Sequence, residues 1–507
     1  MDIFAGSNFS VLDWGIAAVY LIGLVWIGTR TRKYISTMED YITAGHGMRT
    51  ALGVASMSST EMAVVTIMYS AQKGFAGGFA AFHIAVIAAV VTLMVGLTGF
   101  IVAKLRATGV LTIPEYYERR YGRRTRILGG IMLATGGILN MGLFLKVAAM
   151  FIVALTGLES QGWVTAVMVA LLVMTLAYTL LGGMVADLVT DYAQFLVMAV
   201  ALIPATIFAI YTVGWENMFS TVMNLKGEAG FNPLTEGTFG AEYVVWMVFM
   251  GFVSCGIWPT SVARALAADS VKTVHRLYTW ASIGFLARFL IPYVWGICAL
   301  VYVTGNPELS AAFLPAGGGP APVSNLYAVP VFLGRIMPVG LLGLVLAGAL
   351  AAEMSTHDSY LLCWSSVLTQ DVIAPLLGDR MGARARIRLT RILMLVIGVY
   401  LVYWGFVYKG KDDIWDYMAV SGAIYSTGAF SLLLWGLYWK KASSTGAVMA
   451  LISGGFAVLG LDPVQSLFGF HVSSAWVGLA VVALTSLVMV AGSLAFPDRV
   501  PPGRRRR

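Results

Sequence analysis

The sequence predicts an all-α integral membrane protein that crosses the bilayer about 13 times. Of the 507 residues, 59% are hydrophobic and 11% are charged, whereas soluble domains carry about 25% charged residues. Apolar runs long enough to form a membrane helix recur from one end of the chain to the other. The stretches between them are too short for a soluble catalytic domain. We therefore expect a single polytopic domain, 1–507, in a lipid bilayer.

Thirteen segments are predicted as spans: 9–29, 48–72, 79–104, 127–156, 162–182, 187–214, 240–262, 277–304, 338–372, 387–408, 415–438, 444–466 and 473–496. Basic residues concentrate in every second loop, and the positive-inside rule places those loops in the cytoplasm. These residues are Arg30, Arg32 and Lys33; Lys104 and Arg106 to Arg126; Arg264, Lys272 and Arg276; Arg380 to Arg391; Lys440 and Lys441; and Arg499 and Arg504 to Arg507. We predict a cell (inner) membrane protein with its N-terminus outside and a basic cytoplasmic tail, 497–507.

The net charge of +8 does not indicate a nucleic-acid partner, because the basic residues follow loop position instead of forming one patch. The sequence has no HExxH motif, metal triad or nucleophile–histidine pairing, so we expect no enzymatic activity. Its three cysteines lie in predicted spans without a Cys/His cluster, which argues against zinc. We expect the protein to act as a monomer.

Small polar residues interrupt two of the predicted spans. The second span contains GVASMSSTE, from Gly53 to Glu61, and the seventh contains Gly251, Gly256 and Pro259. These interruptions open two sets of five spans, 48–214 and 240–438. Because five is odd, the two sets have opposite orientations, as in an inverted repeat. The span 9–29 then precedes the repeats, and 444–466 and 473–496 follow them, so that the second repeat and the first extra helix together cover 240–466.

The ninth span carries a stripe of small and hydroxyl residues. Ala352, Ser355, Thr356 and Ser359 follow helical spacing, and Asp358 borders them. Such oxygen-bearing side chains are costly in hydrocarbon unless they face the protein interior. Hard oxygen ligands suit a small hard cation better than a transition metal. The stripe therefore predicts coupling to Na⁺ or H⁺.

The chain resembles the sodium:solute symporter family in four motifs. They are TIPEYYERRYG from Thr112 to Gly122, GGMVADLVTDYAQ from Gly182 to Gln194, RALAAD from Arg264 to Asp269 and AEMSTHDS from Ala352 to Ser359. The resemblance implies a LeuT-type fold of two inverted five-helix repeats, with one extra helix before and two after them. It also implies Na⁺-coupled import of a small polar organic solute by alternating access.

The resemblance implies a sodium site between the broken second span and the ninth. Carried over by motif, the sodium ligands are backbone carbonyls of Ala55, Ser58 and Ala352 and the hydroxyls of Ser355 and Thr356. Some members of the family have a second sodium site. Its matching positions here are Asp191, Asp358 and Ser359, which makes a second cation possible without settling it.

Four polar or aromatic residues are candidates for binding the solute. Glu61 either faces a solute amine or hydroxyl, or caps amides freed by the helix break. Lys146 either pairs with an internal carboxylate or binds an anionic solute. Asn140 lies about where a sialic acid transporter of the family has a substrate-binding arginine, and its neutrality argues against that solute. Trp258 is either a core aromatic or a platform for a sugar ring or apolar group.

Glu353 and His357 are one helical turn apart in the ninth span, and the resemblance does not explain them. They form either a structural hydrogen-bonded pair or a titratable couple that senses pH or relays a proton. Lys146 favours an amino acid or a carboxylate as the predicted solute. Two rival functions stay open: proton coupling through Glu353, His357, Asp358 and Asp191, or a transporter-like sensor. The absence of an output domain before Arg507 disfavours the sensor.

Overall fold

The computed structural model describes residues 3–4, 6–30, 37–158, 161–237, 239–315, 321–407 and 414–498. Within these ranges the chain is helical, with one isolated parallel bridge between Met48 and Ala268. The predicted all-α class is therefore confirmed. Part of the predicted charge pattern lies outside the described residues, namely Arg32, Lys33, Arg499 and Arg504 to Arg507.

The helices of the described chain are α1 (Val11–Arg30), α2 (Met38–Thr43), α3 (Thr50–Thr60), α4 (Val64–Gly77), α5 (Phe82–Thr98), α6 (Val102–Ala107), α7 (Ile113–Tyr121), α8 (Arg123–Met141), α9 (Phe144–Thr156), α10 (Gln161–Val213), α11 (Trp215–Lys226), α12 (Ala241–Gly256), α13 (Pro259–Ala267), α14 (Val271–Thr304), α15 (Pro307–Phe313), α16 (Ala328–Ile336), α17 (Leu341–Val367), α18 (Ala374–Leu376), α19 (Ala383–Val407), α20 (Ile414–Tyr438), α21 (Ser444–Gly454), α22 (Asp462–Phe468) and α23 (Ser474–Ala495). A π-helical segment, Leu368–Ile373, continues α17. Short 3-10 segments are Ala44–His46, Gly78–Ala81, Gly227–Phe231, Asn325–Tyr327 and Gly455–Gly460.

Each predicted span coincides with one or two of these helices. Among the described residues, nine helices are long and apolar enough to cross a membrane, and the bent pair α12 and α13 makes a tenth. The polar α17 is not among them. The number thirteen, and the boundaries of the two repeats, therefore stay predictions. The predicted span 444–466 is divided among α21, a 3-10 segment and α22.

The two predicted interruptions are present as helix breaks. The second span ends as α3 at Thr60 and resumes as α4 at Val64. The seventh bends by 41° between α12 and α13, where Trp258 is extended (φ −62°, ψ 126°) and Pro259 begins α13. A residue before proline avoids the helical region, and proline fits the first helical position because no partner exists there for its missing N–H. A third break, between α8 and α9 after Met141, was not predicted.

The predicted spans 162–182 and 187–214 form one element, α10, with a kink at Gly183. This residue has φ 47° and ψ −151°, a conformation open to glycine but strained for other residues. A Cβ atom there would also lie 2.7 Å from the carbonyl oxygen of Tyr41. The kink redirects the chain where the sequence predicts a separation between two spans.

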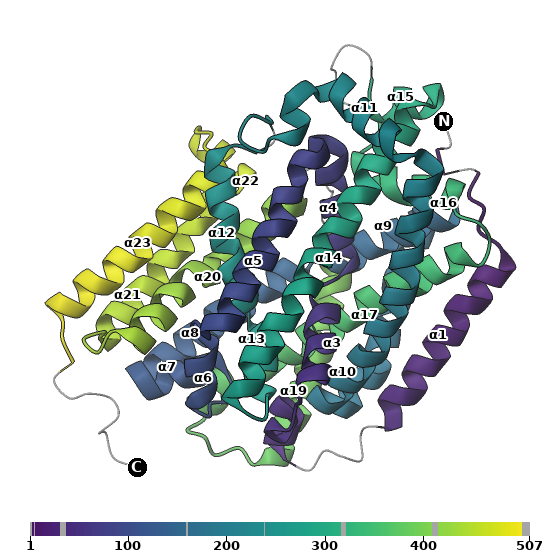
Figure 1. Ribbon diagram of the computed structural model, residues 1–507. Helices are drawn as coiled ribbons and strands as arrows, with labels where there is room; N and C mark the ends of the chain where they lie inside the picture. The colour runs from purple at the N-terminus through teal and green to yellow at the C-terminus, as the bar shows by residue number, and fades with distance from the viewer. Residues whose placement is uncertain are drawn as a thin grey trace.

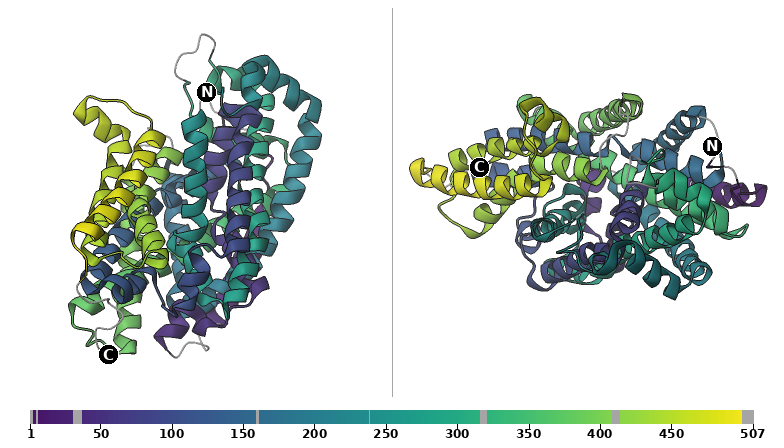
Figure 2. Two further views of the ribbon diagram at one scale, coloured as in Figure 1. Left: turned by 60° about the vertical axis from the view of Figure 1, so that its left-hand side comes forward. Right: turned by 90° about the horizontal axis from the view of Figure 1, so that it is seen from above.

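The interior of the molecule is formed around α17, which packs against α10, α3 and α19. All residues from Val345 to Leu362 are buried. Figure 1 shows α1 at one edge, where it packs on α10 and α17, and α21 and α23 at the opposite edge, where they pack on α20. The views in Figure 2 show the same separation of the two ends of the chain. The polar stretch of α17 is therefore shielded from both edges of the bundle.

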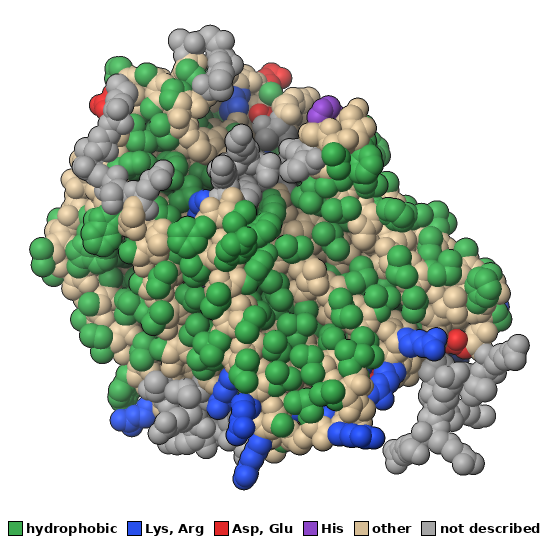
Figure 3. All heavy atoms as spheres, turned by 180° about the vertical axis from the view of Figure 1, so that it is seen from behind, with side chains coloured by type: hydrophobic (Ala, Val, Ile, Leu, Met, Phe, Trp, Pro, Cys, Tyr) green, Lys and Arg blue, Asp and Glu red, His purple; other side chains and the backbone are tan. Residues whose placement is uncertain are grey.

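Basic side chains gather at the end of the molecule that carries α6 and α7, the lower end in Figures 1 and 3. Exposed members of this group are Lys104, Arg119, Arg123, Arg124, Lys272, Arg276, Arg380, Arg384, Arg388, Lys440 and Lys441. One expected member is absent. Arg264 is predicted above as a loop residue, and this is wrong: it lies inside α13 and is 1% exposed.

Candidate functional site

The hydroxyl stripe of α17 contacts the broken end of α3. Ser355 Oγ donates a hydrogen bond of 3.1 Å to the carbonyl oxygen of Ser59, and Thr356 Oγ1 donates one of 2.7 Å to that of Thr60. Both hydroxyls also lie 3.1 Å from the carbonyl oxygen of Ala352. The last carbonyls of a helix lack their usual partners within it, so the break in α3 exposes the carbonyl oxygens of Ser59 and Thr60 to these hydroxyls, although that of Ser59 also accepts the backbone N–H of Met62 at 3.0 Å. Neutral oxygens gathered in this way can bind a monovalent cation.

The structure places Ala55 one turn before Ser59 on α3, and Ser58 directly before Ser59. Both residues line a groove between α3, α10 and α14, and Ser58 Oγ lies close against Gly284. Among the described residues, the α3 carbonyls that receive the two α17 hydroxyls are those of Ser59 and Thr60. The assignment of Ala55 and Ser58 as sodium ligands stays a prediction.

Three buried aspartates meet between α10 and α17. One carboxylate oxygen from each of Asp187, Asp191 and Asp358 lies within 4.8 Å of the others. Tyr178 donates to Asp358 at 2.8 Å, and the backbone N–H of Ser359 donates to the same carboxylate at 2.7 Å. The two residues expected with Asp191 at a second cation site, Asp358 and Ser359, are thus beside it.

Arg264 extends from α13 into this cluster. Four side-chain oxygens surround its Nη2 atom, and we call them the acidic cage: Asp187 Oδ2 at 2.6 Å, Asp191 Oδ2 at 2.9 Å, Ser359 Oγ at 2.5 Å and Thr60 Oγ1 at 2.8 Å. The Nε atom of Arg264 donates to Ser56 Oγ at 3.0 Å. A buried guanidinium needs anionic partners to offset its lost hydration, and the acidic cage provides them.

A central cavity lies between the two broken helices. Its walls come from α4, α5, α8, α12, α14, α17 and α20 and from the two helix breaks, with lining residues Glu61, Tyr69, Ile84, Ala88, Asn140, Met247, Met250, Gly251, Val253, Ser254, Trp258, Arg288, Phe289, Tyr360, Met418, Ala419 and Gly422. Three of the four predicted solute-binding residues are among them. Ligand pockets of this kind combine apolar walls with a few polar groups that fix orientation.

The charged part of the central cavity is an ion pair. Arg288 Nη1 lies 2.7 Å from Glu61 Oε2, and Ser261 and Thr260 donate to the other carboxylate oxygen at 2.6 and 3.2 Å. The guanidinium also lies over the ring of Phe289 at 4.4 Å. The Nε atom of Arg288 has no hydrogen-bond partner in the part of the chain that the structure describes. The cavity therefore contains one anionic and one cationic group, and the buried Nε–H of Arg288 is available as a further donor.

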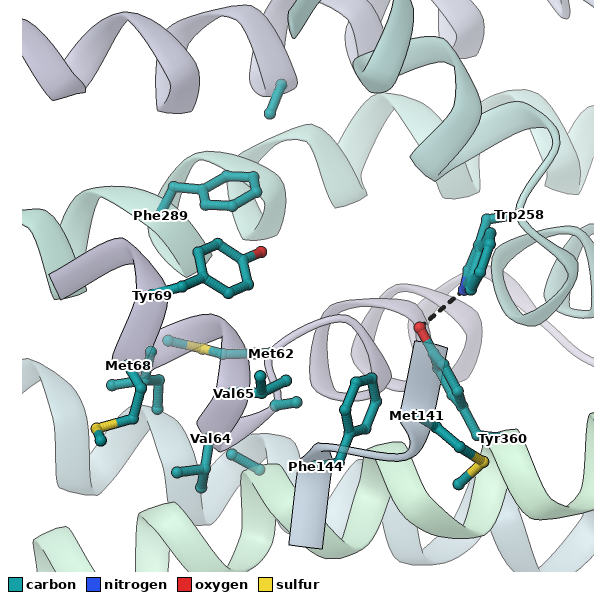
Figure 4. Close-up of a cluster of buried hydrophobic side chains, with 14 of the residues drawn as sticks. Met62, Val64, Val65, Met68, Tyr69, Met141, Phe144, Trp258, Phe289 and Tyr360 are labelled. Atoms are coloured by element: carbon teal, nitrogen blue, oxygen red, sulfur yellow. Dashed lines mark hydrogen bonds between the residues drawn. The ribbon is translucent and has the colours of Figure 1, made fainter. Parts of the chain in front are cut away.

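Aromatic side chains form two facing walls. In Figure 4, Trp258 donates a hydrogen bond of 2.7 Å to the hydroxyl of Tyr360 on one side, and Tyr69 and Phe289 lie together on the other. The Tyr69 and Phe289 ring centroids are 6.4 Å apart. The rings of each pair are tilted, by 46° for Tyr69 and Phe289 and by 48° for Trp258 and Tyr360, and aromatic walls of this kind favour an apolar or flat part of a ligand. Trp258 thus belongs to the cavity wall.

Asn140 and Lys146 differ in their relation to the cavity. Asn140 donates to the carbonyl oxygen of Met418 at 2.9 Å, and its Oδ1 atom is buried without a partner among the described residues. Lys146 lies on α9 near Gly405, outside the residues that line the cavity. Of these two residues, only Asn140 presents a polar group to the cavity, and this group is the acceptor Oδ1.

Glu353 and His357 form a close contact on the buried side of α17. The Nδ1 atom of His357 lies 2.9 Å from Glu353 Oε1, and each side chain is 1% exposed. The imidazole packs edge-on against Phe144, with centroids 5.9 Å apart. Neither residue lines the central cavity.

Sequence reasoning missed four residues of these sites: Asp187, Arg264, Arg288 and Tyr360. A signal existed for Arg288, because a charged residue inside an apolar span marks a functional position. Asp187 lies one helical turn before Asp191, so the same rule identifies it. The role of Arg264 was missed because a basic residue just after a predicted span is assigned to a loop.

The sequence matches the model of a family described as the sodium:solute symporter family over residues 41–454. It is 25% identical to the sodium/proline symporter of Haemophilus influenzae, covering 87% of this chain and 86% of that one. It is 22% identical to the sodium/sialic acid symporter SiaT of Proteus mirabilis, covering 89% and 90%. It is 27% identical to the human sodium/myo-inositol cotransporter, covering 90% and 67%.

Solved structures give the same picture of the fold. A Na⁺-coupled sialic acid symporter in a substrate-bound, outward-open state superposes with a TM-score of 0.82 at 18% identity, covering 97% of this chain and 100% of that one. Mhp1, a nucleobase-cation-symport-1 family transporter in a closed conformation, gives 0.52 at 14% identity, covering 92% and 98%. These likenesses establish a LeuT-like arrangement of helices.

Proposed function

The chain belongs to the sodium:solute symporter family, and from this premise we propose that it imports a small zwitterionic solute, such as a neutral amino acid. Family membership confirms the predicted Na⁺-coupled symport, with Na⁺ as the coupling ion, and makes the protein a multi-pass membrane transporter and not an enzyme. What the family does not fix is the solute, since relatives of this chain are named for proline, sialic acid and myo-inositol.

The observation that carries the proposal is the Glu61–Arg288 pair in the central cavity. The ammonium group of a zwitterionic solute can pair with Glu61, and its carboxylate can pair with Arg288. Neither buried charge is then left unpaired. The free Nε atom of Arg288 allows a two-point contact with a carboxylate. The acceptor Oδ1 of Asn140 is available to a solute N–H.

The apolar walls decide what the rest of the solute can be. Methionine, aliphatic and aromatic side chains make up most of the lining. They fit an aliphatic or ring-shaped side chain better than a row of hydroxyls, which would lose hydrogen bonds to water on entry. A neutral amino acid satisfies both the paired charges and the apolar walls.

For the sodium site, the proposed ligands are Ala352, Ser355 and Thr356 of α17 with carbonyls of α3, predicted as those of Ala55 and Ser58. The hydrogen bonds of both hydroxyls to the end of α3 support this proposal. Sodium would hold α3 against α17 and favour the state that binds solute. Inward opening would separate these ligands, and the difference in ion affinity between the two states would drive transport.

The proposed orientation places the N-terminus outside and the C-terminus in the cytoplasm of the cell (inner) membrane. The basic end of the molecule in Figure 3 supports it, because exposed lysines and arginines favour the cytoplasmic side. The bilayer is the surrounding partner, and a monomer contains every residue assigned to the two sites.

The test is Na⁺-driven uptake into proteoliposomes containing the purified protein. The probes are L-proline, its analogue pyrrolidine without the carboxylate, its analogue cyclopentanecarboxylate without the amine, myo-inositol and a panel of other neutral amino acids. We expect uptake of at least one amino acid and of neither single-charge analogue. Uptake of myo-inositol or of a single-charge analogue, without uptake of any amino acid, would overturn the proposed solute class.

Variants of the ion pair sharpen this test. Arg288→Gln and Glu61→Gln should each abolish amino acid uptake, because each leaves one solute charge unmatched. Arg276→Gln is the matched control, since Arg276 lies on the same helix and is exposed. Normal uptake by both cavity variants would show that the pair does not contact the solute.

A further inference from the structure

The acidic cage holds a nitrogen atom in the way that an ion site holds a cation. Four oxygens from three helices lie 2.5 to 2.9 Å from Nη2 of Arg264. This nitrogen has two protons to donate, so its four oxygen neighbours reflect attraction to a positive charge more than a set of separate hydrogen bonds. Arg264 and both cage aspartates are at most 1% exposed.

Two residues of the cage, Asp191 and Ser359, belong to the predicted second cation site. Both already contact the guanidinium. A sodium ion bound to the same two oxygens would lie within contact distance of Nη2, and two positive charges would then share one buried space. Such an arrangement is repulsive, particularly where water is excluded.

The charge balance of the region holds the guanidinium in place. Asp358 adds a third carboxylate within 4.8 Å of the two cage aspartates, while Arg264 is the cation that the cage binds. The excess of acidic groups makes withdrawal of Arg264 costly, because it would leave buried carboxylates without a counter-ion. The Oδ1 atom of Asp191 is buried and has no partner among the described residues, so it is available to ligate a cation once the guanidinium is removed.

We propose that Arg264 is the resident cation of the acidic cage, so that one Na⁺ and not two accompanies each solute. This inference rests on the proposed Na⁺-coupled function. Arg264 joins α13 to α3, α10 and α17 as a bound ion would, and the sodium site at Ser355 and Thr356 is left as the exchangeable one. Removing the guanidinium while keeping the carboxylates converts the cage into a second, exchangeable cation site.

Equilibrium binding of radiolabelled Na⁺ to the purified, full-length protein tests this without knowledge of the solute. We expect the wild-type protein to bind about one Na⁺ per chain, and Arg264→Gln to bind about two, a twofold rise. Guanidinium ion should displace the added Na⁺ from this variant and leave the first in place. Arg264→Lys keeps a cation in the cage and should bind about one.

The double variant Arg264→Gln/Asp191→Asn is the matched control, because it lacks both the guanidinium and a cage carboxylate. It should return to about one Na⁺ per chain. Two Na⁺ ions on the wild-type protein, or no gain in a folded Arg264→Gln variant, would overturn the inference. If Arg264→Gln does not fold, the number of Na⁺ ions bound per wild-type chain decides whether the inference holds. A wild-type protein that binds no Na⁺ would instead contradict the proposed sodium site.

Discussion

Trp258 and Tyr360 connect the break between α12 and α13 to α17, the helix that carries the proposed sodium ligands Ser355 and Thr356. The indole Nε1 of Trp258, at the break between α12 and α13, donates a hydrogen bond of 2.7 Å to the hydroxyl of Tyr360 on α17. Tyr360 lies one helical turn after Thr356, on the same face of α17. One buried hydrogen bond therefore joins the helix of the proposed sodium ligands to a second part of the cavity wall, and we expect a shift of α17 to be felt there.

Tyr360→Phe should weaken solute binding. The substitution removes the acceptor that fixes the indole of Trp258 in the cavity wall, and we expect solute affinity to fall about fivefold, or by ~1 kcal/mol. Solute-concentration dependence of uptake at saturating Na⁺ measures the effect. Tyr211→Phe is the control, since Tyr211 is 85% exposed. Equal half-saturation concentrations in all three proteins would show that this hydrogen bond does not contribute to solute binding.

Ser355→Ala and Thr356→Ala should each raise the Na⁺ concentration that gives half-maximal uptake. Loss of one hydroxyl ligand to a cation is worth ~1.4 kcal/mol, or about a tenfold change. Ser365→Ala is the matched control: it removes a buried hydroxyl from the same helix, but that hydroxyl bonds to the carbonyl of Leu361 within α17. Unchanged Na⁺ dependence in both test variants would remove Ser355 and Thr356 from the sodium site.

The helices and the position of the polar stripe could be predicted from sequence because they depend on local pattern. Long apolar runs predict membrane helices, and a helix of 3.6 residues per turn places Ser355, Thr356 and Ser359 on one face. Pro259 predicts a break because it cannot continue a helix from the preceding turn. The break after Met141 has no such marker, since Gly142 occurs in a chain rich in glycine.

The partners of buried charges could not be predicted, because they depend on which helices meet. Arg288 and Glu61 are 227 positions apart, and Arg264 and Asp187 are 77 apart. Nothing in the local sequence distinguishes a basic residue at the end of a span from one that turns inward. Lys146 shows the same limit: the sequence left open an internal carboxylate or an anionic solute as its partner, and the structure places it outside the residues that line the central cavity.

Gly183→Ala should destabilise the protein. The kink in α10 requires φ 47°, and an added methyl group would lie 2.7 Å from the carbonyl oxygen of Tyr41. Backbone strain of this kind costs ~1–3 kcal/mol before any steric clash is counted. The midpoint of thermal denaturation in detergent measures the loss.

Gly23→Ala provides the comparison for Gly183→Ala. Gly23 lies within α1, and no atom lies within 4 Å of its added Cβ position. Alanine has a higher helix propensity than glycine by ~1 kcal/mol, so this variant should be as stable as the wild-type protein or more stable. A Gly183→Ala protein that denatures at the same temperature as Gly23→Ala would contradict the need for glycine at the kink.

His357→Gln should leave Na⁺-driven uptake in place and lower stability. His357 and Glu353 contact each other at 2.9 Å, are both 1% exposed, and lie outside the central cavity. Their separation from the cavity favours a structural pair over a proton relay. Removal of one partner of a buried pair costs ~3–5 kcal/mol, and we expect a lower denaturation midpoint with an unchanged Na⁺ requirement.

Two conditions separate the structural pair from the proton-coupled alternative. In Na⁺-free buffer with an inwardly directed proton gradient, wild-type proteoliposomes should show no solute uptake above the level without a gradient. The double variant Glu353→Gln/His357→Gln should recover part of the stability lost by His357→Gln, because it leaves no unpaired carboxylate. Proton-driven uptake in the wild-type protein that disappears in His357→Gln would instead assign the pair to proton transfer. Such a result would make the buried histidine of α17 part of the coupling mechanism, since only a group that changes protonation during transport can link uptake to pH.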